Sequence, residues 1–215
     1  MKLFFYLTFF LSISLKVEAH TFIGMIGFYD GLSHPVLGLD HFLAMVSVGI
    51  VSAQIGGRAI WTVPAAFVLI MIVGGIIGIV VELKEILNPN TVKLSDIKMV
   101  ISFADYLYTI IEIGIIFSVI ALGLTIAIKS NLPVQIILIF VAIFGFFHGA
   151  AHGLEMPQAI NPILFAMGFT CGTAILHIFG VIIGTFSIKT KVSHFILCIV
   201  GICFAIFGIF SLLSF

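Results

Sequence analysis

Charge is what this sequence has least of. Only 8% of its 215 residues are Asp, Glu, Lys or Arg, whereas soluble domains carry roughly 25%. The nine basic and nine acidic residues cancel, so the formal net charge is zero. A chain with neither a basic excess nor an acidic tail has no surface suited to nucleic acid, nor one that gathers cations from a distance. We therefore expect no nucleic-acid partner.

Signatures of cross-linking and of common catalysis are also missing. Cys171, Cys198 and Cys203 lie in apolar segments and form no CxxC pair, which favours packing roles over a disulfide framework. The sequence contains no GxxxxGK(S/T) loop for ATP, no HExxH zinc motif and no GxSxG nucleophile motif. These absences argue against an ATP-driven pump and against an enzyme.

Apolar residues, by contrast, are abundant: 62% of the chain is hydrophobic, including 23 phenylalanines. Runs of about 20 apolar residues can cross a hydrocarbon core about 30 Å thick, and short links make successive helices antiparallel neighbours. We therefore predict an all-α polytopic membrane protein, a bundle of six transmembrane helices in the lipid bilayer. The predicted spans are 35–54, 60–81, 104–128, 132–154, 160–186 and 194–215, with one longer polar connection at 82–98.

The N-terminus has the pattern of a signal peptide. Lys2 precedes an apolar run at 3–15, and Val17-Glu18-Ala19 supplies a small-x-small exit. Cleavage would leave a six-helix transmembrane domain at 20–215 with His20 as its new N-terminus in the periplasm, in a bacterial inner (plasma) membrane. An uncleaved anchor helix is the alternative. The links then assigned to the cytoplasm hold four basic residues, which gives this orientation weak positive-inside support: Arg58, Lys129, Lys189 and Lys191.

The first span opens with HPVLGLDH, which places three ionisable residues at a membrane boundary: His34, Asp40 and His41. Such residues cost at least ~2.5 to 3.5 kcal/mol for Asp, Lys or Arg at the centre of a span, so their presence indicates function. Histidines seven apart return to within about 20° on one helix. Pro35 suits a first helical turn, which would put His34 at the cap. Asp40 projects about 100° from His41, so it is either a ligand reached through local irregularity or a partner that orients an imidazole.

The fourth span closes with FHGAAHGLE, in which His148, His152 and Glu155 share one helical face within about 60°. Neutral imidazole suits nickel, cobalt, copper and zinc, and a carboxylate adds charge. A glycine stripe beside this face would let a neighbouring helix bring its own side chains up to the histidines; it comprises Gly145, Gly149 and Gly153.

The predicted topology puts the two motifs at the same side of the membrane, because the first span runs inward from His34 and the fourth runs outward to Glu155. Six ionisable side chains in two compact groups favour a metal or proton pathway over buried hydrogen bonding between helices. Two weaker polar stripes, in the third and fifth spans, could line a path, join helices or relay protons. They are Asp105, Thr109 and Glu112, and Thr170, Thr173 and His177.

Both histidine motifs resemble those of the HupE/UreJ family of nickel and cobalt permeases. The resemblance continues through the segment from Glu112 to Gly123 and through Thr173-Ala-Ile-Leu-His177, and covers essentially all of the chain after the signal peptide. It implies a secondary permease that carries nickel or cobalt inward across the bacterial inner membrane, with the ion as transported substrate and no permanently bound cofactor. The metal motifs of the family fall on six residues: His34, Asp40, His41, His148, His152 and Glu155. His20 is similar to a histidine that many members carry after the signal peptide.

Other functions are compatible with histidines in a membrane. A membrane-embedded zinc-dependent hydrolase also uses histidines with an activating carboxylate. A haem protein would need axial ligands on opposite faces of the macrocycle, which His148 and His152 on adjacent turns do not suit. A non-transporting metal-binding accessory protein or sensor is the third alternative.

Overall fold

The computed structural model describes residues 27–87, 94–128, 132–156, 159–187 and 189–215. Within these ranges it describes all side chains except those at 84–87, 94–105 and 191. The expected signal peptide and His20 lie outside the described residues, and so does the boundary at residue 20 of the expected domain.

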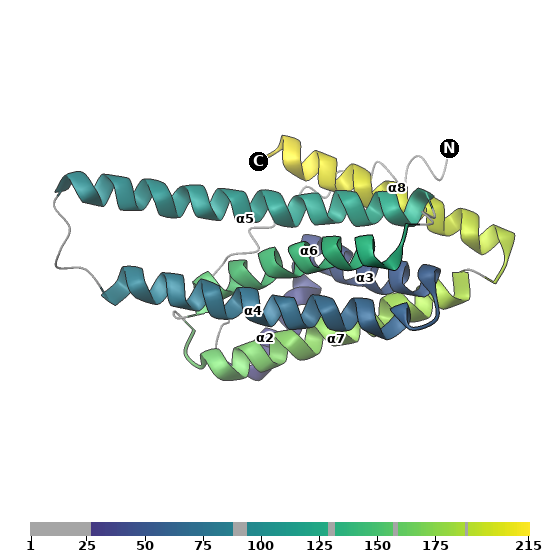
Figure 1. Cartoon of the computed structure of the whole chain (residues 1–215), viewed down its shortest axis with the longest axis horizontal. Helices are drawn as coiled ribbons and strands as arrows, with labels where there is room; N and C mark the ends of the chain where they lie inside the picture. The colour runs from purple at the N-terminus through teal and green to yellow at the C-terminus, as the bar shows by residue number, and fades with distance from the viewer. Residues whose placement is uncertain (1–26, 88–93, 129–131, 157–158, 188) are drawn as a thin grey trace.

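The described part of the chain is entirely helical and contains no strand, as predicted (Figure 1). Five helices are long and apolar enough to cross a membrane, and a bent pair of shorter helices makes a sixth candidate span. The all-α multi-pass fold is thereby confirmed. The helices are α2 (Phe28–Leu37), α3 (Leu39–Ile55), α4 (Ala59–Leu87), α5 (Leu94–Ile128), α6 (Val134–Glu155), α7 (Pro162–Ser187) and α8 (Lys191–Leu213).

The first span differs from the prediction because it is broken. The chain bends by 83° between α2 and α3. α2 begins at Phe28, so Pro35 lies inside it rather than in a first turn, and His34 belongs to its last turn rather than to a cap. Pro35 has no N–H to continue the helical ladder, and the extended Gly38 (φ −78°, ψ 110°) separates the two helices. The expectation that His34 and His41 share one helical stripe was therefore wrong; the bend, not the periodicity, directs them.

The polar connection predicted at 82–98 is also shorter than expected. α4 continues to Leu87 and α5 already begins at Leu94, and both helices extend beyond the rest of the bundle in Figure 1. Residues 82–87 read Glu-Leu-Lys-Glu-Ile-Leu, a series of residues with good helix propensity. Polarity indicated where the apolar span ends, but it did not indicate the end of the helix.

Close helix contacts confirm the expected role of the glycine stripe. A Cβ on Gly145 would lie 2.7 Å from the carbonyl oxygen of Phe67, and one on Gly149 would collide with the backbone of Met71. α4 can therefore pack directly against α6 only because these positions lack side chains. This contact brings Phe67 and Met71 of α4 beside the α6 histidines.

α3 occupies the centre of the bundle, and every residue from Leu43 to Ala53 is buried. A helix that is apolar all round is expected in such a core position. α7 packs directly against α3, because a Cβ on Gly49 of α3 would meet the backbone of His177 and Gly180. α3, α6 and α7 thus place their polar side chains in one interior.

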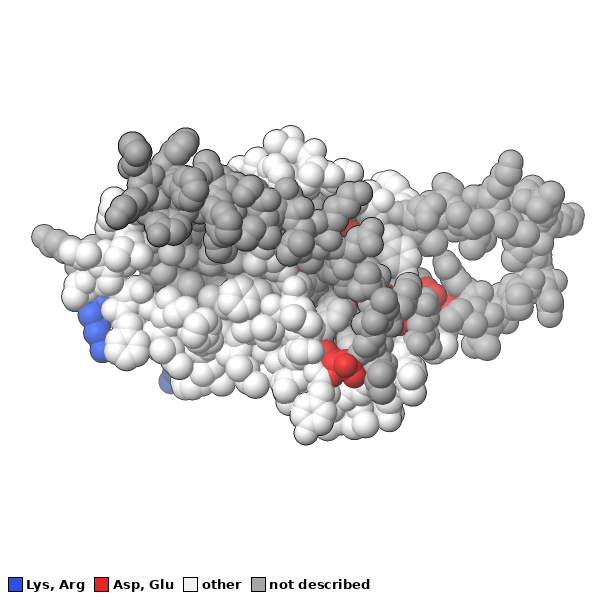
Figure 2. All heavy atoms as spheres, turned by 180° about the vertical axis from the view of Figure 1, so that it is seen from behind, with Lys and Arg blue, Asp and Glu red and all other residues white. Residues whose placement is uncertain are grey.

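The two described basic side chains, Arg58 and Lys189, are exposed and follow the ends of α3 and α7. Figure 2 shows the basic atoms gathered at one end of the molecule, away from the acidic ones. His41 stands in the first turn of α3, whose 17 residues span about 25 Å at 1.5 Å per residue. His41 and the described basic residues therefore lie at opposite ends of the bundle.

Candidate metal centre

The two histidine motifs meet in the interior, as the predicted topology required. Nε2 of His41 on α3 lies 2.8 Å from Nε2 of His152 on α6, although the residues are 111 positions apart. Both side chains are buried, at 0% and 1% exposure. Neither imidazole faces the lipid.

Asp40 orients His41. Its Oδ1 accepts the backbone N–H of His41 at 2.9 Å and lies 3.0 Å from the ring Nδ1. A carboxylate at this distance favours the proton on Nδ1, which leaves the lone pair of Nε2 directed toward His152. Of the two roles open to Asp40 from the sequence, the geometry supports that of a partner that orients an imidazole.

His148 is fixed in a similar way, by the backbone of its own helix. Its Nδ1 donates to the carbonyl oxygen of Phe144 at 2.9 Å, since a carbonyl can only accept. Its Nε2 is buried and has no hydrogen-bond partner among the described residues. The ring centroid lies 5.0 Å from that of His41. His148 therefore presents a second oriented lone pair to the same interior.

His34 and Glu155 border His152. The centroid of the half-buried His34 lies 4.7 Å from that of His152. Oε2 of the buried Glu155 lies 3.6 Å from Nδ1 of His152. On the α7 side the Phe169 ring packs against His152 at 4.3 Å. Four imidazoles and two carboxylates thus lie close together, and the Phe169 ring covers them on the α7 side.

The described side chains do not form a ready-made metal shell: no group of three or more His, Cys, Asp or Glu among them is arranged to hold one ion. The His41–His152 distance of 2.8 Å is shorter than the about 2.9 to 3.4 Å that separates two imidazole nitrogens bound at about 2.0–2.1 Å to one ion. A shared ion would require these rings to separate by a few tenths of an ångström. Metal binding by the six residues therefore stays a prediction.

The fifth-span stripe enters the same interior. Thr173 and His177 of α7 are buried, at 0% and 1% exposure. The Thr173 hydroxyl lies 3.9 Å from Sδ of Met71, and the His177 ring lies 5.1 Å from that of Phe67. Thr170, on the same helix, is half-buried.

The third-span stripe is placed only in part. Thr109 and Glu112 lie half-buried on α5. The side chain of Asp105 lies outside the described ones. Its suggested place in a pathway therefore stays a prediction, as does that of His20.

Phe67, Met71 and Phe169 are parts of the site that the sequence did not indicate. The fully buried Phe67 contacts the rings of both His148 and His177, with centroids 5.5 Å and 5.1 Å away. In a chain this rich in phenylalanine, no local pattern marks one ring as special. The glycine stripe of α6 signalled a close neighbour, but it did not indicate which helix.

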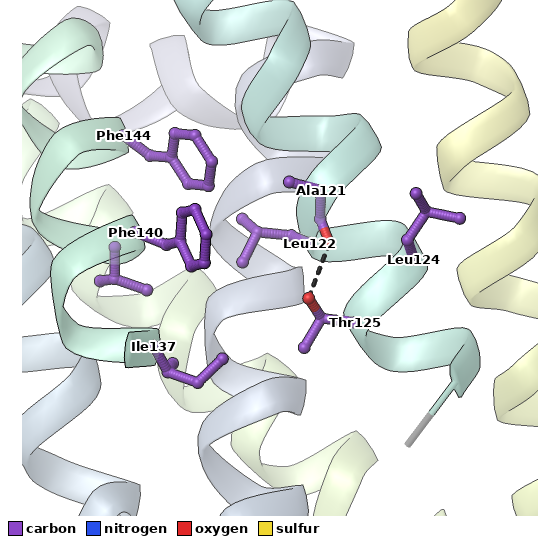
Figure 3. A pocket seen from close by; sticks show the side chains of 8 residues that line it. Ala121, Leu122, Leu124, Thr125, Ile137, Phe140 and Phe144 are labelled. Carbon is purple, nitrogen blue, oxygen red and sulfur yellow. Dashed lines mark hydrogen bonds between the residues drawn. The ribbon is translucent and has the colours of Figure 1, made fainter. Parts of the chain in front are cut away.

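A cavity of about 210 Å³ lies between α5 and α6 (Figure 3). Its lining is apolar apart from Thr125, whose hydroxyl donates to the carbonyl of Ala121 at 2.7 Å. The Phe144 side chain lines this cavity, while its backbone carbonyl accepts the hydrogen bond from His148, which does not line it. Because no ionisable side chain lines it, this cavity does not suit a metal ion.

Comparison with known proteins finds matches along most of the chain. A family model described as "HupE / UreJ protein" matches residues 8–84 and 90–211. The chain is 36% identical over 172 residues to "Protein HupE" of Rhizobium leguminosarum bv. viciae, an alignment that covers 79% of this chain and 78% of that protein. No solved structure matches.

Proposed function

The chain belongs to the HupE/UreJ family, a family of membrane metal transporters and accessory proteins and not of enzymes; on this premise we propose that it is a secondary transporter that takes up nickel or cobalt ions across the bacterial inner membrane. The ion is its substrate, and the histidine cluster is its capture site.

The observation that carries the proposal is the contact between His41 and His152. Two motifs at distant points of the chain place imidazole nitrogens 2.8 Å apart, in an interior that excludes lipid. Neutral imidazole with neighbouring carboxylates is a ligand set that suits nickel and cobalt. A small separation of the rings would admit one ion, with His148 and His34 within reach as further ligands.

The membrane potential supplies the energy for uptake. An interior-negative potential contributes about 2.3 kcal/mol per charge per 100 mV, hence roughly 4.6 kcal/mol for a dication. This suffices without ATP, for which the sequence has no binding loop. Entry at the histidine end requires that end to face the periplasm and the end with Arg58 and Lys189 to face the cytoplasm, an orientation that agrees with the positive-inside rule.

Uptake of radioactive nickel by expressing cells tests the proposal, with cobalt, zinc and copper as competitors. We expect His41→Ala and His152→Ala to lower uptake by about 10- to 100-fold at equal protein in the membrane. His194→Ala on α8 is the matched control, because His194 contacts Cys198 of its own helix, and should transport normally. Retained uptake in both cluster variants would remove the cluster from the pathway.

An accessory role gives a different result. The wild-type chain would then accumulate no more nickel or cobalt than cells with empty vector, while the purified protein would still bind the ions in equilibrium dialysis. That outcome would replace transport by metal binding as the function of the same cluster.

A further inference from the structure

His177 is a buried histidine whose ring nitrogens have no role in the packing. Its side chain is 1% exposed, and neither Nδ1 nor Nε2 has a hydrogen-bond partner among the described residues. Burying polar atoms in this way is unfavourable, so such a group calls for an explanation such as a ligand. Its backbone lies against Gly49 of α3, which fixes its position in the bundle.

The ring of Phe67 contacts both His177 and His148 of the histidine cluster. Its centroid is 5.1 Å from that of His177 and 5.5 Å from that of His148. Nε2 of His148 also has no hydrogen-bond partner within the described part of the chain. One fully buried phenyl ring therefore contacts two imidazoles, each of which has a ring nitrogen without a hydrogen-bond partner among the described residues.

His177 lies farther along the bundle than the cluster. Phe169, which packs against His152, precedes His177 by two helical turns, or about 12 Å along the axis of α7. α7 continues from there to Ser187 and the exposed Lys189. A path from the cluster to the basic end would therefore pass His177 after His148.

Soft and hard donors lie one helical turn from His177, on the side of the histidine cluster. Thr173 lies one turn earlier on the same face of α7, and its Oγ1 is 3.9 Å from Sδ of Met71. Met71 in turn lies one turn after Phe67 on α4. Imidazole nitrogen, thioether sulfur and hydroxyl oxygen together favour a transition-metal ion over magnesium or calcium.

We propose that His177 is an inner binding position for the transported ion, with Thr173 one turn before it on α7, and that the Phe67 ring separates the His177 imidazole from the outer histidine cluster. The inference rests on the proposed function, because it assigns a second step to the same pathway. The ion leaves His148, passes the edge of the Phe67 ring and is bound again by His177.

A matched pair of substitutions in the full chain tests the inner position. Cysteine and serine are nearly the same size, but thiolate binds cadmium strongly, since soft ligands select soft ions. We expect purified His177→Cys, titrated with cadmium, to develop a cadmium–thiolate ultraviolet band beyond that of the wild type. His177→Ser, which keeps the same three native cysteines, should not. Nickel should compete with cadmium for this added band.

Transport provides the second readout. Both variants should lose at least about tenfold in nickel uptake, yet bind nickel at the outer cluster within about threefold of wild type. His177→Cys should regain uptake of cadmium, whereas His177→Ser should not. A merely structural histidine would give equal results for cysteine and serine, which would overturn the inner position. Loss of equilibrium nickel binding in both variants, as in His41→Ala, would overturn it too.

The two proposals fail separately. If the wild type transports nothing, the proposed function is lost, and the cadmium band alone decides whether His177 is a binding position. Should neither His177 variant fold, as judged by size-exclusion chromatography in detergent, Thr173→Cys against Thr173→Ser repeats the comparison one turn away. Absence of an added band in Thr173→Cys would then count against the inner position.

Discussion

Asp40 and His41, neighbours in sequence, form a closed pair in which one carboxylate oxygen receives both the backbone N–H and the ring Nδ1 of the next residue, at 2.9 Å and 3.0 Å. The pair stands in the first turn of α3, where a negative charge also complements the helix dipole. Asp40 therefore acts on the cluster through His41.

Loss of the Asp40 carboxylate should weaken metal binding without abolishing it. In Asp40→Asn the amide can still meet Nδ1, but as a neutral group that no longer favours the proton on Nδ1. We expect about 10- to 100-fold weaker nickel affinity, measured by equilibrium dialysis on purified protein. Asp30→Asn is the control, because Asp30 caps α2 by accepting the N–H of Gly27 at 3.1 Å. Equal affinity in the two variants would argue against the orienting role of Asp40.

Acid should reduce uptake. Only neutral imidazole binds metal, so protons compete with the ion for the ring nitrogens. As the external pH falls, this competition should slow uptake. The measurement is initial nickel uptake into proteoliposomes at about pH 5 and about pH 7.5 with the same imposed potential. Equal rates at the two values would speak against imidazole ligands.

A single methyl group at Gly149 should destabilise the bundle. A Cβ there would collide with the backbone of Met71. Forcing extra volume into a packed interior lowers the stability of a protein by about 1–3 kcal/mol, and we expect a loss of this order here. Gly149→Ala should therefore lower the unfolding temperature in detergent. Gly27→Ala serves as the control, since a Cβ at Gly27 would meet nothing within 4 Å. An unchanged unfolding temperature would show that α4 and α6 do not pack as closely as described.

Cysteine labelling should reveal the orientation. A membrane-impermeant thiol reagent added to intact spheroplasts should reach Tyr29→Cys on α2, whose side chain is 81% exposed. It should not reach Arg58→Cys until the membrane is opened, because that position lies at the basic end. The wild type measures the background from native cysteines. The reverse pattern would invert the proposed direction of entry.

The multi-pass fold and the convergence of the two motifs were accessible from the sequence. Apolar runs must form helices in a bilayer, and the 3.6-residue period already placed His148, His152 and Glu155 on one face. The break in the first span was not accessible. Gly38 adopts ordinary extended angles, and a single extended residue leaves no periodic signature.

The aromatic parts of the site were hidden for another reason. Phe67 and Phe169 belong to the site only because of their position in space, and their residue type does not distinguish them from the other apolar residues of this chain. His177 was only one member of a weak polar stripe in the fifth span until the structure showed that its buried nitrogens have no hydrogen-bond partner among the described residues. The ionisable residues of the site could be picked out from the sequence because they are rare in this chain. The apolar residues that line the site could be identified only from their neighbours in the structure.

The break at Gly38 also has a consequence for hydration. A new helix that starts at Leu39 leaves N–H groups of its first turn without intrahelical partners, and hydrocarbon cannot satisfy them. Protein atoms or water must therefore surround that turn, as the Asp40 carboxylate does for the N–H of His41. We expect an incoming ion to reach His41 where hydrocarbon is kept away from the backbone, so that it can exchange its aqua ligands for imidazole one at a time.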